Sequence, residues 1–255
     1  MLNRLDLGRR ARAAGWHLLI SAAVAALAAA LVFGLWYPGA YRHLSGGRGL
    51  FILVVTVDVI LGPLLTFAVF NLNKGWPHLR RDLVIIGVIQ LAGLAYGLHT
   101  VYAVRPVATV FETDRFRVVT ASEVYLPELP QAPEQYRSLP LDGPRLLSTR
   151  RPAPGEERNE ALMMALNQGV DVGQRPLFWR PYDEGRAAAL ERARPIEVLL
   201  RKYETRAAEF RAALADAGLP ETDARFLPVM ARGDWVAVLD KQGNIATFLA
   251  ADGFF

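Results

Sequence analysis

Residues 50–72 read LFILVVTVDVILGPLLTFAVFNL, and this stretch decides the fold. Only one of its side chains, that of Asp58, carries a charge. A helix needs about 20 apolar residues to cross the ~30 Å hydrocarbon core of a membrane. Two further apolar segments of similar length, residues 17–36 and 83–103, lie on either side of it. Three such segments joined by short loops predict a three-helix transmembrane bundle over residues 17–104.

Basic residues flank the three segments unevenly. Seven precede the first segment or separate the second from the third, and two separate the first from the second: Arg4, Arg9, Arg10, Arg12, Lys74, Arg80 and Arg81 against Arg42 and Arg48. Cytoplasmic loops carry an excess of Lys and Arg. This bias predicts a cytoplasmic basic N-terminus, residues 1–16, and a periplasmic domain after residue 104.

The first segment has a second interpretation, as a cleaved signal peptide. It follows a basic stretch and contains small residues at Ala28–Ala30. Its apolar run is longer than the 7–15 residues usual for a signal peptide, which favours an uncleaved anchor. An intact mass that places the first residue near position 31 would overturn this interpretation.

Composition excludes several classes of function. Residues 104–255 carry twenty Lys and Arg against twenty-two Asp and Glu, so this half has no net positive field to hold nucleic acid. The chain has no cysteine, which excludes disulfides, thiolate zinc sites and a cysteine nucleophile. It also lacks a phosphate-binding glycine loop, a Gly-x-Ser-x-Gly elbow and a His-Glu-x-x-His zinc motif. We therefore expect no catalytic residues, no metal and no cofactor.

Residues 105–255 read as a small α+β domain. Two pairs of β-rich runs around short turns predict hairpins at 107–120 and 235–250. Seven of the sixteen prolines fall in residues 125–155, which predicts an extended or partly mobile loop. Helices are expected at 156–168, where Ala161, Leu162, Ala165 and Leu166 share one face, at 183–193, and from Pro195 to Gly218.

Asp58 is the most informative polar residue, because a charged side chain in the membrane costs about 2.5–3.5 kcal/mol unless it faces protein or a cavity. Counting helical depth from residue 50 makes Tyr96 and His99 its expected partners, with Gln90 deeper in the third segment. Asp58 has three interpretations: a structural residue that fixes the bundle, a docking point for the membrane helix of another protein, or a proton relay.

Small residues predict close helix contacts. Gly93 and Gly97 lie four residues apart on the third segment, and Ala22, Ala26 and Ala30 form a stripe on the first. Such faces let helix backbones approach in lipid, either within this bundle or toward a partner. Gly62 and Pro63 should kink or loosen the second segment.

In the polar half, residues 175–182 read RPLFWRPY and place aromatic rings between arginines. Single-stranded nucleic acid can bind such a surface, but the negative balance of this half argues against it. A loop packed on the sheet is the first interpretation, and a protein-binding patch is the second.

The chain resembles the type IV pilin accessory proteins of the TfpX/TfpZ type, over nearly its whole length. The most specific part of the match is the stretch from Val57 to Asn71. The residues that carry the resemblance are Trp36-Tyr-Pro-Gly, Leu44-Ser-Gly-Gly-Arg, Val57-Asp-Val-Ile-Leu-Gly-Pro-Leu-Leu-Thr66, Val69-Phe-Asn71, Asp82-Leu83, Gln90-Leu-Ala-Gly-Leu-Ala-Tyr96-Gly97, Ala103-Val-Arg-Pro106, Phe111 with Asp114-Arg-Phe-Arg-Val-Val119, and Gly233-Asp-Trp-Val-Ala-Val-Leu-Asp240.

This resemblance implies a non-enzymatic inner-membrane chaperone for type IV pilin. Its partners would be the membrane helix and the globular head of the pilin, the lipid bilayer and the inner-membrane pilus assembly proteins. We expect the pilin helix to lie against Asp58, Gly62, Pro63, Gln90, Gly93, Tyr96 and Gly97. Two other classes of function stay open: a membrane enzyme that modifies pilin, and a ligand-sensing membrane subunit.

Overall fold

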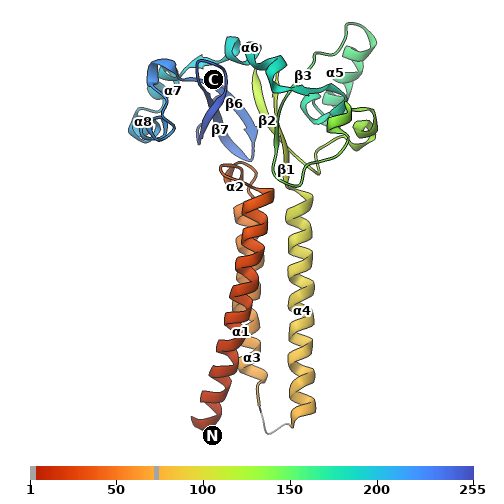
Figure 1. Ribbon diagram of the computed structural model, residues 1–255, viewed down its shortest axis with the longest axis vertical. Helices are drawn as coiled ribbons and strands as arrows, with labels where there is room; N and C mark the ends of the chain where they lie inside the picture. Colours follow the sequence, from red (N-terminus) through yellow and green to blue (C-terminus); the bar gives the residue numbers. More distant parts are fainter. Residues whose placement is uncertain (1–3, 72–74) are drawn as a thin grey trace. The chain divides into compact units, whose positions relative to one another are not determined.

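The computed structural model describes residues 4–71 and 75–255, and it divides the chain into two compact units (Figure 1). The helical unit comprises Met1–Pro38 and Gly46–Val104. The sheet unit comprises Gly39–Ser45 and Arg105–Phe255. Residue 72, where the second apolar segment was expected to end, and the basic residue Lys74 lie outside the described residues.

Three long helices form the helical unit. They are α1 (Arg4–Leu31), which continues as the π-helical turn η1 (Val32–Trp36), α3 (Gly47–Val69) and α4 (Trp76–Ala103). Gly46 and Gly75 precede α3 and α4 with φ of 68° and 81°, a region of the backbone map that glycine enters without strain. The glycines thus allow the chain to turn into each helix.

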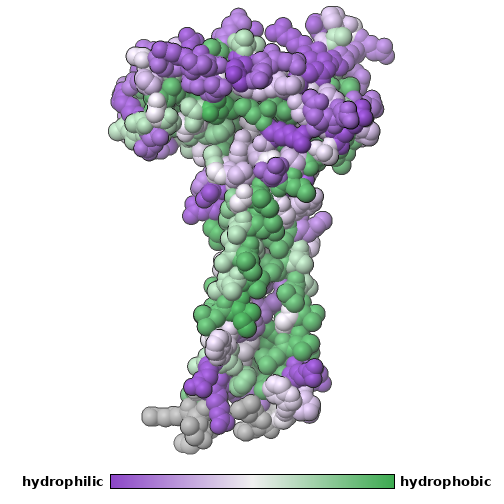
Figure 2. All heavy atoms as spheres, viewed as in Figure 1, coloured by the Kyte–Doolittle hydropathy of each residue, from purple (hydrophilic) through white to green (hydrophobic). Residues whose placement is uncertain are grey.

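Two of these helices are long and apolar enough to cross a membrane, namely residues Leu7–Trp36 and Trp76–Ala103. Only 11% and 17% of their apolar windows are buried, so they present their hydrocarbon side chains outward (Figure 2). A core helix of a soluble protein would be largely buried. The apolar part of α3, Val55–Val69, is shorter than these two helices. A third membrane span therefore stays a prediction.

Within the helical unit, α1 and α4 each pack along α3, whereas in the described part of the chain they contact each other little. The three helices converge at one end, where Val32, Tyr37 and Val101 are buried and the Tyr37 hydroxyl donates to the Val101 carbonyl at 2.9 Å. The face of α1 that packs inward includes Ala25 and Ala28. Ala22, Ala26 and Ala30 are exposed, so the interpretation of this stripe as a contact within the bundle is wrong, and a contact toward a partner stays a prediction.

The sheet unit contains an eight-stranded mixed sheet. The hairpins predicted from the sequence are confirmed, and a parallel pairing of β2 with β6 joins them in one sheet. The strand order is β4-β3-β1-β2-β6-β7-β8, with β5 paired to β6. The strands are β1 (Pro106–Glu112), β2 (Arg115–Thr120), β3 (Arg145–Thr149), β4 (Trp179–Pro181), β5 (Arg194–Pro195), β6 (Arg225–Ala231), β7 (Gly233–Leu239) and β8 (Ile245–Leu249).

The proline-rich stretch is more ordered than expected. It forms the 3₁₀ turns η3 (Leu126–Gln131) and η4 (Glu134–Tyr136), and then strand β3, which pairs with the central strand β1. Ala132 and Tyr136 are buried against the sheet. The expectation of an extended loop is therefore wrong where the chain enters the sheet.

Four helices of more than one turn follow β3: α5 (Glu156–Gln168), α6 (Tyr182–Arg192), α7 (Ile196–Lys202) and α8 (Ala207–Asp216). The continuous helix predicted from Pro195 to Gly218 is wrong. It breaks at Tyr203, where the backbone leaves the helical region and the turn η7 (Glu204–Arg206) follows. The Tyr203 hydroxyl bonds to the backbone of Asp252 at 3.1–3.2 Å, and this tertiary contact holds the break.

The sheet unit also includes a segment from between two helices of the helical unit. The short helix α2 (Tyr41–Leu44) lies in this segment, and its Leu44 is fully buried with Leu227 and Leu239. The Leu44 carbonyl accepts a hydrogen bond from the Arg232 N–H at 2.8 Å. The Tyr41 and Thr109 hydroxyls are hydrogen-bonded at 2.8 Å. Leu44, with the partly buried Ala40 and Tyr41, thus contributes to the core of the sheet unit.

Candidate functional site

Asp58 lies at the middle of α3, eleven residues from Gly47 and eleven from Val69. At ~1.5 Å per residue, each end of the helix is roughly 16 Å away. This depth is the most costly position for a charge if α3 crosses a membrane. The surroundings of Asp58 therefore decide its role.

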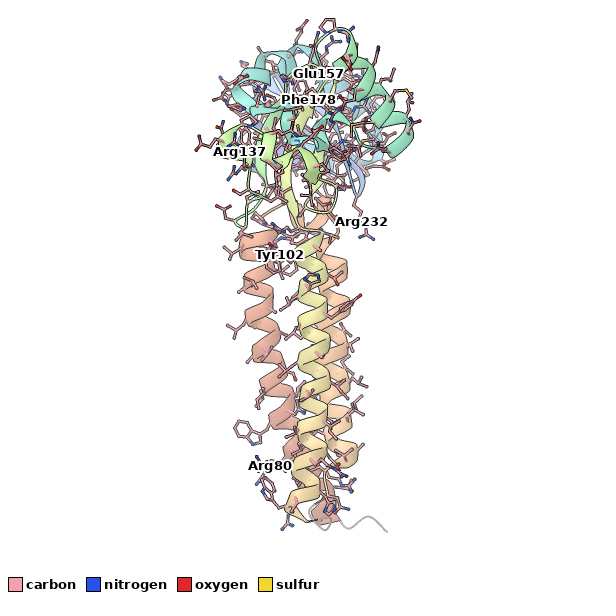
Figure 3. All side chains as sticks on the ribbon, turned by 90° about the vertical axis from the view of Figure 1, so that its right-hand side faces the viewer. Arg80, Tyr102, Arg137, Glu157, Phe178 and Arg232 are labelled. Carbon is pink, nitrogen blue, oxygen red and sulfur yellow. The ribbon has the colours of Figure 1, made fainter. Side chains whose placement is uncertain are left out.

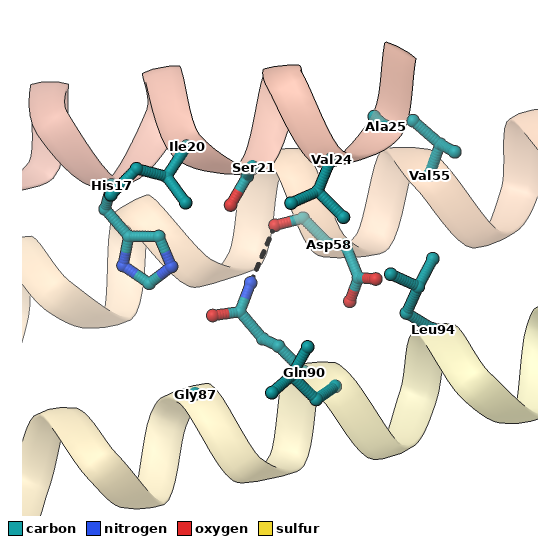
Figure 4. A pocket seen from close by; sticks show the side chains of 11 residues that line it. His17, Ile20, Ser21, Val24, Ala25, Val55, Asp58, Gly87, Gln90 and Leu94 are labelled. Atoms are coloured by element: carbon teal, nitrogen blue, oxygen red, sulfur yellow. Dashed lines mark hydrogen bonds between the residues drawn. The ribbon is translucent and has the colours of Figure 1, made fainter. Parts of the chain in front are cut away.

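A cavity of about 230 Å³ lies beside Asp58, with walls from all three long helices (Figure 4). The cavity lies away from the end at which the three helices converge. At its level α1 and α4 both pack on α3 but stay apart from each other. Ile20 of α1 and Leu91 of α4 line it and are largely exposed, so the cavity is open along this side. Its polar lining consists of His17 and Ser21 from α1, Asp58 from α3 and Gln90 from α4.

Gln90 bridges α4 to α3. Its Nε2 donates to the backbone carbonyl of Asp58 at 3.0 Å (Figure 4). Gly62 makes room for this bridge, because a Cβ built on Gly62 would overlap the Gln90 amide. Pro63 follows at once and lacks the N–H that would bond the carbonyl four residues earlier, which loosens this turn of α3. Gly62 and Gln90 thus form a joint between the two helices, and Pro63 follows this joint in α3.

Two acceptors at this joint have no partner. The Oε1 of Gln90 is buried without a hydrogen bond. In the described residues, no hydrogen bond or ion pair reaches the Asp58 carboxylate either. One carboxylate oxygen, Oδ1, lies 3.9 Å from a Cβ built on Gly93. The absent side chain of Gly93 therefore leaves space in front of the carboxylate.

The expected partners of Asp58 are wrong. Tyr96 is 74% exposed and His99 is exposed as well, so neither reaches the carboxylate. The depth estimate started at residue 50, but α3 begins at Gly47 and is three residues longer at that end. This shift moves the facing residues of α4 about one turn deeper, to Gln90, Gly93 and Leu94.

Of the seven residues predicted to form the site, the structure brings three together around the joint, namely Asp58, Gly62 and Gln90. Gly62 and Pro63 are buried, and Gln90 is half-buried. Gly93 adjoins the carboxylate, Gly97 is buried nearer the convergent end, and Tyr96 points outward.

The sequence interpretation missed His17, Ser21 and Thr66. His17 Nδ1 lies 2.5 Å from the hydroxyl of the buried Thr66, which ties α1 to α3. His17 and Ser21 are four residues apart in an otherwise apolar stretch of α1, residues 13–31, so they share one face. That spacing is the signal that would have placed both at the cavity.

The sheet unit uses the aromatic stretch 175–182 as core. Phe178 is fully buried between two guanidinium groups, with Arg150 4.4 Å and Arg175 4.8 Å from its ring centroid. Arg175 is itself buried and forms ion pairs with Glu128 and Glu160. The first interpretation of this stretch, a loop packed on the sheet, is confirmed.

Glu157 of α5 completes this cluster (Figure 3). Both nitrogens Nη1 and Nη2 of Arg150 donate to its carboxylate, at 2.8 and 2.6 Å. The Ala153 N–H donates as well. These hydrogen bonds lower the pKa of Glu157 from 4.5 to about 2. Among the described residues, no three His, Cys, Asp or Glu side chains are grouped so that they could hold a metal ion.

Comparison with known proteins identifies relatives of the chain. A family model described as "Fimbrial assembly protein FimB" matches residues 6–46. A protein of Dichelobacter nodosus named "Fimbrial assembly protein, serogroup I" is 38% identical over 96% of this chain and 96% of its own length. Its serogroup E1 counterpart is 36% identical over the same shares. The protein of serogroups C1 and C2 is 43% identical over 48% of this chain and 93% of its own length.

No solved structure matches the chain. The matches to the serogroup I and E1 proteins extend over both units, and the family model extends from α1 to the segment that joins the sheet core. The family model and the two relatives that match over nearly the whole chain both agree with the resemblance seen in the sequence motifs. The chain therefore belongs to the family of fimbrial assembly proteins.

Proposed function

We propose that the protein is a non-enzymatic accessory of type IV pilin that holds its cognate pilin in the bacterial inner membrane before assembly of the pilus. Its relatives are named fimbrial assembly proteins, which supports a role in pilus biogenesis. In this proposal α3 is the third membrane span beside α1 and α4. The cavity beside Asp58 receives the apolar N-terminal helix of the pilin.

One observation carries the proposal. The described helices leave a cavity open along one side, at mid-depth, with apolar rims and unpartnered acceptors at the Asp58–Gln90 joint. A bundle that served only as an anchor would gain stability by closing around such groups, because an unsatisfied polar group in hydrocarbon costs several kcal/mol. An open polar cavity suits a membrane protein that receives a helix from another chain.

The proposed orientation rests on charge. Arg9, Arg10 and Arg12 lie near the start of α1, and Arg80 and Arg81 near the start of α4. By the positive-inside rule these ends are cytoplasmic, which makes the sheet unit periplasmic. In that compartment the sheet unit would meet the globular head of the pilin and select the cognate partner.

Photo-crosslinking tests the proposal in cells that express the cognate pilin. A crosslinkable residue at position 91, on the rim of the cavity, should capture pilin. The same residue at position 89 is the matched control, because Leu91 and Ile89 are 65% and 64% exposed but only Leu91 lines the cavity. Substitution of an unrelated pilin should abolish the band. Equal capture at both positions, or none at either with normal expression, would refute docking in this cavity.

Asp58→Asn provides the second test. We expect the pilin band to weaken while the amount of protein in the membrane stays normal. A collapse in the amount of protein would instead make Asp58 a structural residue of the bundle. The intact mass of pilin, compared with and without this protein, tests the enzyme alternative: an added group that depends on the protein would contradict a non-enzymatic role.

A further inference from the structure

At the joint between α3 and α4, two groups of hydrogen-bond acceptors have no partner in the described part of the chain. The Asp58 backbone carbonyl can only accept, so the Gln90 atom that faces it must be Nε2. Oε1 is therefore the atom of Gln90 left without a partner. The Asp58 carboxylate adds a second group of acceptors beside it.

The other polar residues of the cavity do not meet this need. Nδ1 of His17 is engaged with Thr66. In the described part of the chain, no hydrogen bond joins His17 or Ser21 to Asp58 or Gln90. Water is scarce in hydrocarbon, and a buried acceptor without a partner costs about 1–3 kcal/mol. A donor from another chain would meet this need.

The rims of the cavity define the rest of the occupant. Ile20, Val24, Leu91 and Leu94 present hydrocarbon to whatever lies between α1 and α4. Its volume of about 230 Å³ holds side chains rather than a whole helix. The backbone of the occupant would therefore lie along the opening and insert side chains.

We propose that the occupant is a membrane helix that is apolar except for one hydrogen-bond donor at mid-depth, a hydroxyl or an ammonium, which reaches the Asp58 carboxylate. This inference rests on the proposed function, because it assumes that the cavity receives a helix. It adds the chemistry by which that helix is selected. A helix with a carboxylate at the same depth is rejected by Asp58, which gives discrimination as well as affinity.

Binding of model peptides to the purified full-length protein tests this inference. The protein is placed in lipid nanodiscs of phosphatidylethanolamine and phosphatidylglycerol. Labelled Leu/Ala helices of about 21 residues carry Ser, Lys, Asp or Leu at their centre, and association is followed by energy transfer. An interhelical hydrogen bond in a membrane is worth about 1–2 kcal/mol, so the Ser and Lys peptides should bind about fivefold to thirtyfold more tightly than the Leu peptide.

Variants show whether the preference comes from the cavity. Asp58→Leu should reduce the advantage of the Ser and Lys peptides. The double variant Asp58→Leu with Ile60→Asp moves the carboxylate to an exposed face of the same helix, and it should not restore that advantage. Asp58→Asn should bind the Asp peptide more tightly than the unsubstituted protein does, a gain that misfolding cannot produce.

Equal binding of all four peptides, or restoration by Ile60→Asp, would overturn the inference. These outcomes are independent of the pilin crosslink. Capture of pilin without a donor preference would leave the proposed function standing and this inference refuted. A donor preference without pilin capture would leave this inference standing and refute the proposed function.

Discussion

Gly62 is the residue that lets Gln90 reach α3. A side chain at this position would occupy the space of the Gln90 amide, and the bond from Nε2 to the Asp58 carbonyl would be lost. The spare acceptors of the cavity depend on this bond, because it fixes which Gln90 atom remains free. The absence of a Cβ at Gly62 thus determines which polar atoms of Gln90 are left at the joint.

Gly62→Ala should destabilise the helical unit by about 1–3 kcal/mol, the usual cost of overpacking. The measurement is SDS-induced unfolding of the full-length protein in mixed micelles. Gly87→Ala is the matched control, because a Cβ on this cavity glycine meets nothing within 4 Å, and its effect should stay within about 0.5 kcal/mol. Equal stability of the two variants would show that Gln90 moves away at no cost.

Glu157 makes the stability of the sheet unit depend on pH. Its folded pKa of about 2 is below the ordinary 4.5, so the Arg150–Glu157 interaction stabilises fully above pH 4.5 and is lost as the pH falls toward 2. Glu157→Gln should therefore lower the unfolding temperature of the full-length protein at pH 6, and the difference should shrink to nothing near pH 2.

The control for this prediction is Glu156→Gln. Glu156 is exposed and has no ion pair in the described residues, so its substitution should leave the unfolding temperature at pH 6 unchanged. A difference for Glu157→Gln that does not vary between pH 6 and 2 would contradict the assigned cause.

Asp58 could be recognised from the sequence, because one acid in an apolar segment is conspicuous. Its neighbours on α4 could not be recognised, because their depth is counted in residues from the start of each helix, and the sequence does not fix that start. The three residues by which α3 exceeds the predicted start moved the position that faces the Asp58 carboxylate from Tyr96 to Gly93. Polar partners on neighbouring helices follow from the register between helices, which only packing determines.

At the scale of elements, α5 is rotated about its axis relative to the expectation, although Ala161 of the predicted face is buried. Its buried side includes Ala161, Met164 and the ion-paired Glu157, while Leu162 and Leu166 are more than half exposed. The reason lies in the core beneath it, where Arg150 and Arg175 need carboxylate partners. Apolar spacing alone could not show this, because the arginines that turn the helix lie elsewhere in the sequence.

Substitutions on the two sides of α5 check this orientation. Met164→Ala removes a buried side chain and should cost about 2–5 kcal/mol. Leu166→Ala removes an exposed one and should change the free energy of unfolding by no more than about 0.5 kcal/mol. Urea unfolding of the full-length protein in detergent measures both. The opposite ranking would mean that Leu166 packs inward.

Other elements show the same limit. The hairpins β1–β2 and β7–β8 were predictable because strands and turn lie close together in the sequence. Strand β6 was missed, since Pro228 interrupts its pattern and its two long partners come from both hairpins. Strand β6 joins the two hairpins into one sheet. Its pairing with β2 is a contact between residues far apart in the sequence.

At the scale of the whole molecule, the chain enters the sheet unit twice. It enters at residues 39–45 and again at Arg105. The first entry contributes Leu44 to the core and bonds it to Arg232. The segment between η1 and α3 therefore folds with the sheet unit, the rest of which comes after α4 in the sequence.

Leu44→Ala should destabilise the sheet unit by about 2–5 kcal/mol, although Leu44 precedes the start of the first strand, Pro106, by 62 residues. Hydrogen exchange of β6 and β7 in the full-length protein reports the loss as reduced protection. Leu35→Ala, an exposed position in η1, is the control and should leave protection of β6 and β7 unchanged. Normal protection in Leu44→Ala would show that the sheet unit does not need this segment.

The early position of Leu44 has a consequence for biosynthesis. Arg232, whose N–H the Leu44 carbonyl accepts, is added 188 positions later. At ~5–20 residues per second, a ribosome needs roughly 10–40 s to cover that distance. During this interval residues 39–45 have been made, while the turn between β6 and β7 that bonds Leu44 does not yet exist. The core of the sheet unit thus closes only late in translation, by recruiting a segment made near its beginning.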